Sequence, residues 1–368
     1  MLAGALAHAQ SWQPPARFTR PDLATDEGGL WGIMDREEAR LRRSPFVLRD
    51  PELTGYVQNL ACRLAGDHCP DIRVVLVRTP LFNANMAPNG MMQVWTGLLL
   101  RVENEAQLAA ILGHEIGHYL SRHSVERLRD LKSSAAVGQF LGLFGLAGAI
   151  GQLALVAGMF AYSRDQERDA DRIGLTLMRN AGYEPLEAPK VWSNLLLEMN
   201  ARPDHDPARN SVLFATHPSP EERQDELKRM AETAPGGATN GEIWESKVKP
   251  YRRAWLADEV KRGQHEESIA LLTRLMKDAP SQPDFPFARG ESYRLRGRES
   301  DLDAALADYQ AAIALGAEPP ETHRGMGLIY RVRKQLPEAK ASLQHYLESA
   351  PDAPDFLMIK SYVEETGS

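Results

Sequence analysis

The chain has 368 residues, of which 43% are apolar and 25% are charged, and its formal net charge is −7. This composition is ordinary for a globular protein, and the length allows two or three domains, each with a sizeable core. Because the charge is negative and no long basic run is present, the chain lacks the electrostatic footprint of a nucleic-acid-binding protein. We therefore expect no nucleic-acid partner.

The N-terminus has features of a targeting sequence. Residues 1–9 are small and apolar, and they end in Ala7-His8-Ala9 before Gln10, an A-x-A sequence of the kind that precedes a signal-peptidase cut. No Lys or Arg precedes this stretch, and it is shorter than usual. We interpret it as the remainder of a signal peptide that is removed near Ala9, which predicts an exported protein.

The chain has two cysteines, Cys62 and Cys69. They can close a small disulfide, and an even number of cysteines fits an oxidising compartment such as a periplasm. Two unrelated thiols are the alternative. Their spacing is not that of a zinc-binding cysteine pair, so we do not expect cysteine ligands.

The segment before the first strong motif indicates helices and two short strands. A short helix is expected near Asp35–Arg42, within an otherwise loose arm, and apolar residues at helical spacing predict a helix over 51–66. The β-branched run Ile72–Val77 predicts a buried strand, Asn83–Gly90 is rich in turn residues, and Met91–Trp95 predicts a second strand. Strands beside several helices predict an α+β domain with a small sheet.

The next helix carries a metal-binding motif. Asn104 is a suitable N-cap with Gln107 as its capping-box partner, and the helix is expected to run to His123. It contains the pattern HExxH, in which His114 and His118 stand one turn apart on one face. Both imidazoles can therefore bind one ion.

A catalytic zinc site needs three protein ligands and one open position. Glu115 stands beside the two histidines, where it can activate a water molecule but is not placed to be the third ligand. The metzincin pattern fails, because Ser121 and Ser124 occupy the positions where it needs Gly and His. The alternative is a glutamate on a second helix: Glu167, in the segment SRDQERDAD, can complete a His₂Glu site. Asp171, one turn later, can hydrogen-bond a ligand imidazole.

Residues 133–163 contain no charged side chain and are long enough to cross a bilayer. The sequence allows three alternative structures for this segment: a transmembrane span, an apolar hairpin or lid, and a buried core helix pair. If His118 and Glu167 share one metal, both ends of the segment lie on the same side of any membrane, which excludes a single crossing. We favour a hairpin or a long helix packed over the active site, and a peripheral contact with a membrane stays open.

The C-terminal third has a different character. Residues 235–242 are rich in Gly and Pro and predict a linker. After it, helix–turn–helix units recur at about the 34-residue period of tetratricopeptide repeats, most clearly over 320–353. Such repeats stack into a concave surface that binds peptides or partner proteins. The predicted division is a signal-peptide remainder, a mainly helical metalloprotease domain with a small sheet, a linker and an all-α repeat domain, over residues 1–9, 10–234, 235–242 and 243–368.

Four segments together resemble one known family. They are NANMAPNGMMQVWTGLL at Asn83–Leu99, HEIGH, SRDQERDAD, and THPSPEER at Thr216–Arg223. They resemble the zinc peptidases that include HtpX and the CAAX prenyl endopeptidases, over about residues 50–230. With the repeats that follow, the chain is similar to the BepA-like subgroup, periplasmic proteases of outer-membrane quality control.

The resemblance implies one Zn²⁺ per chain, bound by His114, His118 and Glu167. It also implies that Glu115 is the general base and that Asp171 orients a ligand imidazole. An intact Glu115 favours an active enzyme with protein or peptide substrates in the periplasm.

The resemblance also brings the loop of His217 to the active site. Two roles are open for His217 there: it stabilises the oxyanion of the tetrahedral intermediate as a catalytic residue, or it fills the open zinc position and holds the enzyme inactive. The alternative to both is a loop histidine that makes only a local hydrogen bond. We further expect substrate to bind as an extended strand along the edge of the second predicted strand. The residues of that strand are Met91, Met92, Gln93, Val94 and Trp95.

The predicted function is a zinc-dependent endopeptidase that cleaves unfolded or misassembled proteins in outer-membrane quality control. The repeats would bind substrates or a partner such as the outer-membrane assembly machinery. One alternative is a chaperone or assembly adaptor in which the zinc site is latent. Another is a scaffold in which zinc has only a structural role.

Overall fold

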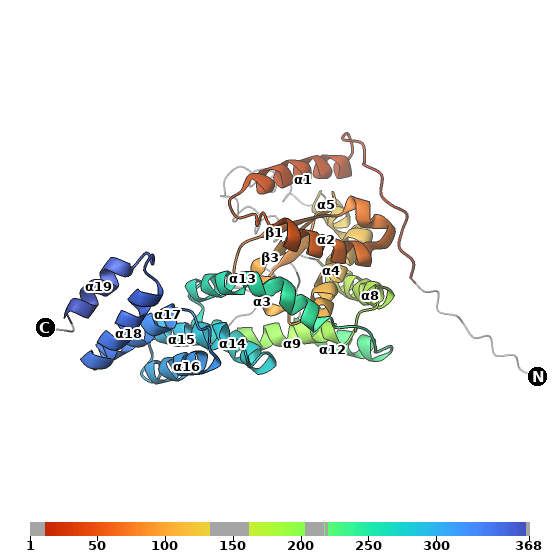
Figure 1. Cartoon of the computed structure of the whole chain (residues 1–368). Helices are drawn as coiled ribbons and strands as arrows, with labels where there is room; N and C mark the ends of the chain where they lie inside the picture. Colours follow the sequence, from red (N-terminus) through yellow and green to blue (C-terminus); the bar gives the residue numbers. More distant parts are fainter. Residues whose placement is uncertain (1–11, 133–161, 203–216, 218–219, 366–368) are drawn as a thin grey trace, which may run out of the picture.

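A computed structural model describes residues 12–132, 162–202, 217 and 220–365 (Figure 1). The expectations for residues 1–9 and for most of 133–163 lie outside these described residues. Figure 1 shows a rounded N-terminal part in which α1 lies over one face of a small sheet, and a row of C-terminal helices that extends away from it to the left. In the part of the chain that the structure describes, no helix is long and apolar enough to cross a membrane.

The sheet has three strands in the order β1-β3-β2. They are β1 (Arg73–Val77), β2 (Ala84–Met86) and β3 (Met91–Trp95). β3 pairs parallel with β1 along its whole length, and residues Met92–Val94 pair antiparallel with β2. The expectation that substrate adds to an edge at Met91–Trp95 is therefore wrong, because β3 is the central strand. The turn-rich segment contains β2, which forms an outer edge of the sheet instead.

Helices surround this sheet and form most of the N-terminal part. In chain order they are α1 (Asp26–Arg43), α2 (Pro51–Ala65), the short 3₁₀ helix η1 (Gly66–Asp71), α3 (Thr96–Arg101), α4 (Glu105–Leu120), α5 (His123–Lys132), α8 (Arg164–Asn180), α9 (Glu187–Met199) and α12 (Pro220–Glu232). α1 is longer than the expected short helix, because Thr25 caps it by accepting a hydrogen bond from the Gly28 backbone. The prediction of a mainly helical α+β domain with a small sheet is confirmed.

α4 begins as the sequence predicts and ends earlier. The Asn104 side chain accepts a hydrogen bond from Gln107 N at 2.9 Å, which satisfies a backbone donor of the first turn. The Gln107 side chain accepts from Glu103 N rather than from Asn104 N. Arg122 has a φ of 57°, in the left-handed region, so the chain turns there and α5 starts as a separate helix.

α4 and α8 cross at very short range. A Cβ on Gly117 of α4 would stand 2.9 Å from Ala170 O of α8, and a Cβ on Gly113 would stand 3.1 Å from Gly174 O. Only glycine fits such an approach, because it has no side chain between the two backbones. This crossing brings the acidic segment of α8 against the HExxH face of α4.

The C-terminal region consists of helices joined by short turns. They are α13 (Gly241–Lys261), α14 (His265–Asp278), α15 (Asp284–Arg296), α16 (Asp301–Leu315), α17 (Glu321–Val332), α18 (Leu336–Ser349) and α19 (Phe356–Glu365). Consecutive helices pack against each other, as α15 does with α16 and α17 with α18. This agrees with the expected helical region, and the assignment to tetratricopeptide repeats stays a prediction.

The hydrophobic core is continuous across the predicted linker. Trp244 and Leu272 of the C-terminal helices belong to the same buried cluster as Leu60 and Leu108 of the N-terminal part. Buried ion pairs reinforce the junction, since Arg101 contacts carboxylates on α9 and α13. The first C-terminal helices are thus packed as one body with the N-terminal part.

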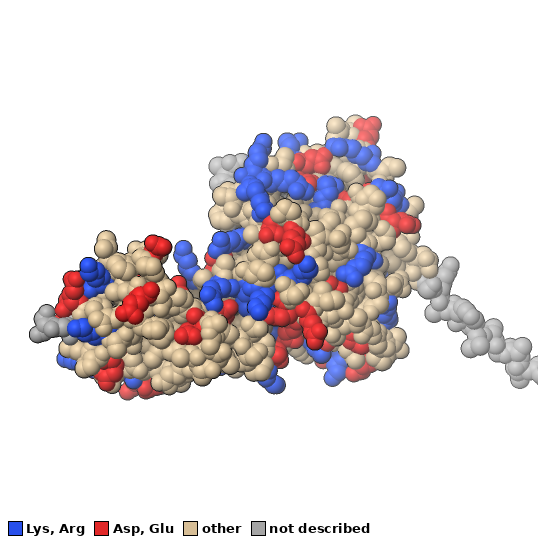
Figure 2. All heavy atoms as spheres, viewed as in Figure 1, with Lys and Arg blue, Asp and Glu red and all other residues tan. Residues whose placement is uncertain are grey.

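Two further features concern the surface and the covalent structure. Cys62 and Cys69 form a disulfide between the end of α2 and η1, which confirms the disulfide interpretation. Figure 2 shows Lys and Arg side chains gathered over the C-terminal end of α1, whose last turn contains Arg40, Arg42 and Arg43. Elsewhere on this face, acidic and basic side chains alternate.

Candidate metal centre

The HExxH residues of α4 lie inside the molecule, not on its surface. The exposed fractions of His114, Glu115 and His118 are 6%, 3% and 1%. The Nε2 atoms of the two histidines stand 3.1 Å apart. The one-turn spacing on a single helix therefore brings both imidazoles to one point, as the sequence pattern requires.

α8 brings a buried carboxylate to the same point. Ser163 caps this helix through a capping box with Gln166, so Glu167 lies at the end of its first turn. The two carboxylate oxygens of Glu167 lie 3.5 Å from His114 Nε2 and from His118 Nε2. Glu167 itself is 1% exposed.

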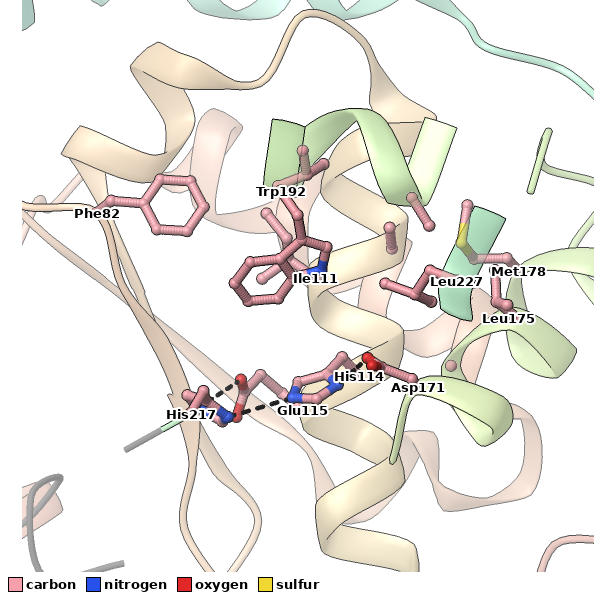
Figure 3. A pocket seen from close by; sticks show the side chains of 14 residues that line it. Phe82, Ile111, His114, Glu115, Asp171, Leu175, Met178, Trp192, His217 and Leu227 are labelled. Atoms are coloured by element: carbon pink, nitrogen blue, oxygen red, sulfur yellow. Dashed lines mark hydrogen bonds and ion pairs between the residues drawn. The ribbon is translucent and has the colours of Figure 1, made fainter. Parts of the chain in front are cut away.

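His217 is the fourth residue at this point. Its Nδ1 lies 2.8 Å from Glu167 Oε1 and 3.3 Å from His114 Nε2. Figure 3 shows His217 beside Glu115 and His114 at the base of a pocket. The structure thus brings His217 next to the three residues that the sequence indicated as ligands.

These four residues fit a bound metal ion. One ligand atom from each of His114, His118, Glu167 and His217 lies within 4.8 Å of the other three. Ligands of a tetrahedral zinc, with bonds of ~2.0–2.1 Å, stand about 3.3 Å apart, and the separations here are similar. The Nε2 atoms of the two buried imidazoles face each other, and the buried Glu167 carboxylate lies beside both of them. Such a donor set suits Zn²⁺.

The remaining nitrogens of the two HExxH imidazoles also have partners. His114 Nδ1 lies 2.9 Å from Asp171 Oδ1, in the position that the sequence predicted for an orienting carboxylate. His118 Nδ1 lies 2.9 Å from His123 Nδ1, and the His118 ring stacks on Tyr162 with 3.8 Å between ring centroids. These contacts hold both rings in the orientation that points Nε2 inward.

Sequence reasoning assigned no role to Arg223, which is central to this site. Its guanidinium binds Asp171 through Nε and Nη2, at 2.8 and 2.6 Å, and its Nη1 lies 2.7 Å from Glu167 Oε2. Burial raises the pKa of the Glu167 carboxyl, but the charges of His217 and Arg223 outweigh burial and hold this pKa well below its usual range. The available signal was the segment THPSPEER, which ends in Arg223.

Glu115 points toward the same space without joining the ligand cluster. Its Oε1 lies 3.6 Å from His217 Nε2. Burial is the largest influence on this carboxyl and raises its pKa above the usual value. A carboxylate with a raised pKa beside a metal position suits a group that takes up and returns a proton.

An apolar cavity of about 30 Å³ opens directly beside Glu115 and His114. Figure 3 shows Phe82, Ile111 and Trp192 above these two residues, and Leu227 beside them. The side chains come from elements that are far apart in the sequence, including α4, α9 and α12. The site thus combines a candidate metal position, a candidate base and an apolar recess.

Comparison with known proteins agrees with this geometry. Residues 47–231 match the model of peptidase family M48. The chain is 29% identical to the beta-barrel assembly-enhancing protease of Escherichia coli (strain K12) over 235 residues, which are 58% of this chain and 47% of that protein. It is 27% identical to the putative beta-barrel assembly-enhancing protease of Vibrio cholerae over 345 residues, 90% of this chain and 62% of that protein.

A third relative is the mitochondrial metalloendopeptidase OMA1 of Arabidopsis thaliana, 33% identical over 151 residues, which are 41% of this chain and 30% of that protein. The chain therefore spans less than two thirds of the length of these relatives. The family match extends from the segment before β1 to the end of α12, so it includes every residue of the candidate metal centre. The chain belongs to peptidase family M48.

Proposed function

We propose that this protein is a zinc-dependent endopeptidase, with one Zn²⁺ held by His114, His118 and Glu167. The observation that carries the proposal is the convergence of these three buried side chains on one point, with Glu115 beside them. A His₂Glu ligand set is typical of catalytic zinc, which keeps one position open for water or substrate.

When bound, zinc supplies a water molecule of lowered pKa and polarises the scissile carbonyl. Glu115 then accepts the proton of the attacking water and passes it to the leaving amine. Asp171 and Arg223 act through other residues: they hold the His114 ring and the Glu167 carboxylate in place.

Substrate recognition is proposed to follow the sheet edge and the apolar cavity. β2 offers an outer edge, on which an extended chain can pair through its main chain. The cavity beside Glu115 is lined by apolar side chains such as Ile111 and Trp192 and has room for a small apolar side chain. We place the substrate residue next to the scissile bond there. Main-chain pairing with one small pocket suits a protease that accepts many unfolded chains.

His217 is proposed to close the site in the conformation described. Its Nδ1 stands where a fourth ligand would be, close to both Glu167 and His114. A water or a substrate carbonyl needs that position, so His217 has to move before cleavage. In the other role, His217 leaves the fourth-ligand position but stays close enough to the metal centre to stabilise the oxyanion.

The biological role that we propose is cleavage of unfolded or misassembled proteins during outer-membrane assembly, in the periplasm. Support comes from two relatives, the beta-barrel assembly-enhancing protease of Escherichia coli and the putative beta-barrel assembly-enhancing protease of Vibrio cholerae. In this proposal the metalloprotease domain spans 10–234, residues 235–242 join it to a tetratricopeptide-repeat domain over 243–368, and the repeats bind substrates or the assembly machinery.

The test is degradation of an unfolded, disulfide-free protein by the wild type and by Glu115→Gln, with zinc content measured for both. We expect both to hold about one zinc per chain and only the wild type to cleave. Cleavage by Glu115→Gln at the wild-type rate would remove Glu115 from the mechanism. Failure of both proteins to bind zinc would remove the metal assignment.

A chaperone or assembly adaptor with a latent zinc site is the second candidate, and the position of His217 favours it. The same experiment separates the two functions. If neither protein cleaves although both hold zinc, and both equally delay aggregation of the unfolded protein, the adaptor function is the better account.

A further inference from the structure

A second and much larger cavity lies away from the metal centre. Its volume is about 660 Å³, within the ~300–1,000 Å³ of typical ligand pockets. It is bounded by the end of α3, by one face of α13 and by the turn that joins α14 to α15. None of the metal-centre residues lines it.

The floor of this cavity is apolar and aromatic. Trp244, Val248 and Trp255 of α13 line it together with Phe285 of α15. Each is at most 5% exposed, so the floor is rigidly packed and presents only small parts of these side chains. The small apolar areas that these side chains leave open can contact an apolar side chain of a ligand.

The rim of the cavity is acidic. Of the described residues that line it, four carry carboxylates: Glu103, Glu242, Glu245 and Asp278. The single basic residue in the lining, Arg252, is buried and paired with Glu245. The cavity therefore has an excess of negative charge.

Two of these carboxylates lack a cationic partner. Among the described residues, no Lys or Arg lies within ion-pair distance of Glu242 or Asp278, whereas Glu103 is paired with Arg274. Burial and the nearby Glu103 carboxylate raise the pKa of Asp278 and outweigh the opposite influence of Arg274 and Lys277. The negative charge of Asp278 is therefore disfavoured, and a cation bound beside it would stabilise that charge.

Arg252 provides an independent sign of a missing ligand. Its side chain is 5% exposed, and Nη2 binds Glu245, but Nη1 is buried and has no hydrogen-bond partner in the part of the chain that the structure describes. A buried donor without a partner is costly. A main-chain carbonyl of a bound peptide would satisfy it.

We propose that this cavity binds an extended peptide segment in which a Lys or Arg stands beside an aromatic or large aliphatic residue. The apolar side chain packs on Trp244, Trp255 and Phe285, the cationic side chain lies between Glu242 and Asp278, and Arg252 Nη1 donates to a peptide carbonyl.

The cavity adjoins the start of the catalytic helix. Trp244 Nε1 donates to Val102 O, and Glu103 N donates to the Gln107 side chain of α4. A segment bound here is therefore close to the element that leads into HExxH. The role of the cavity rests on the proposed protease function: it holds one part of an unfolded chain while another part of that chain reaches the metal centre.

The test measures binding to the full chain in a Glu115→Gln background, which keeps peptides intact. Because both native cysteines are in the disulfide, Ser281→Cys at the rim gives a single thiol for an environment-sensitive dye. The probes are three short peptides that alternate Phe with Lys, Phe with Glu, and Ser with Lys. We expect saturable dye changes with Phe-Lys only, and no change when the dye is at Ser349→Cys, an exposed position of α18.

A charge-reversal pair then tests the rim. Glu242→Lys with Asp278→Lys should weaken binding of the Phe-Lys peptide at least about tenfold. The matched control, Glu348→Lys with Asp352→Lys, makes the same change at exposed positions outside the cavity and should leave affinity within about twofold. Equal weakening by both pairs, or equal binding of all three peptides, would overturn the proposal.

These outcomes are separable from the protease function. If the Phe-Lys peptide does not bind but the wild type cleaves an unfolded protein, only the proposed peptide-binding role of the cavity is rejected. If the peptide binds but the wild type does not cleave, only the proposed protease function is rejected.

Discussion

Gly174 of α8 packs directly against the backbone of His114 on α4, so that a Cβ at position 174 would stand 2.9 Å from His114 N. On the α4 side, Gly113 and Gly117 meet Gly174 and Ala170 at similar range. The metal centre depends on this contact, because Glu167 and Asp171 reach the two histidines only if the helices cross without intervening side chains.

Replacement of Gly174 by Ala should therefore weaken metal binding and lower stability. The added Cβ overlaps backbone atoms that cannot move independently, so α8 must shift away from α4. We expect a lower melting temperature and reduced zinc affinity, measured by thermal denaturation and by competition with a chelator.

Gly29→Ala is the matched control, because a Cβ on Gly29 of α1 meets nothing within 4 Å. Alanine is favoured over glycine inside a helix by about 0.5–1 kcal/mol, so this variant should be slightly more stable than the wild type. If Gly174→Ala behaves like Gly29→Ala, close crossing of the two helices is not what positions the ligands.

Glu167→Ala should lose zinc while the C-terminal helices stay folded. The substitution removes one of three proposed ligands and also removes one of the two carboxylates that form ion pairs with Arg223. The checks are metal content and far-ultraviolet circular dichroism. Asp165→Ala is the control, since Asp165 lies on the same first turn but its side chain is 93% exposed. Full retention of zinc by Glu167→Ala would rule out this ligand assignment.

The ligand helices were predictable from sequence because their signals are local. The spacing of His114 and His118 on one helix, and the place of Glu167 in the first turn of another, both follow from short-range rules of helix geometry and capping. The strand order was not predictable in this way. β2 is only three residues long, and its pairing makes β3 a central strand, which depends on contacts between segments that no local pattern specifies.

Buried charge was the other feature that sequence reasoning missed. Arg223 lies in a polar helix and resembles a solvated residue, yet it is 4% exposed. Its burial is stable only because α8 presents two carboxylates to it, on Glu167 and Asp171. His123 is likewise buried, and its partner His118 lies on the preceding helix. Such partners become visible only when the helices are packed.

His217→Ala should raise the rate of cleavage of an unfolded protein without loss of zinc. The imidazole occupies the position that substrate needs, so its removal opens the site, while three proposed ligands remain. The measurements are initial cleavage rate and metal content, with His345→Ala of α18 as a distant histidine control. A clear fall in rate at unchanged zinc content would instead assign His217 to stabilisation of the oxyanion.

The last prediction concerns the junction between the N-terminal part and α13. Arg101 binds Glu198 Oε2 of α9 at 2.7 Å and Glu259 Oε2 of α13 at 3.0 Å, and all three side chains are at most 5% exposed. Arg101→Met removes the buried cation that joins the two carboxylates, while Arg274 stays beside Glu198 and Arg262 beside Glu259. Loss of one partner from a buried ion pair typically costs about 3–5 kcal/mol. Arg253→Met, which breaks an exposed pair with Asp284, should cost at most about 1 kcal/mol.

The cost of Arg101→Met should also depend on pH. Burial raises the pKa of Glu259, but in the wild type the charges of Arg101 and Arg262 outweigh burial and lower it. The wild type therefore loses part of its stability as the pH falls and Glu259 takes up a proton. In the variant, Arg101 no longer lowers the pKa of Glu259, so burial favours the protonated carboxyl more strongly. Acidification then neutralises a buried carboxylate that has lost a partner, which offsets part of the cost of the substitution. The unfolding free energies of the wild type and Arg101→Met, measured by urea denaturation, should thus differ less at acidic pH than at neutral pH. A difference that is constant with pH, or no larger than that of Arg253→Met, would show that Arg101 does not hold the two parts together.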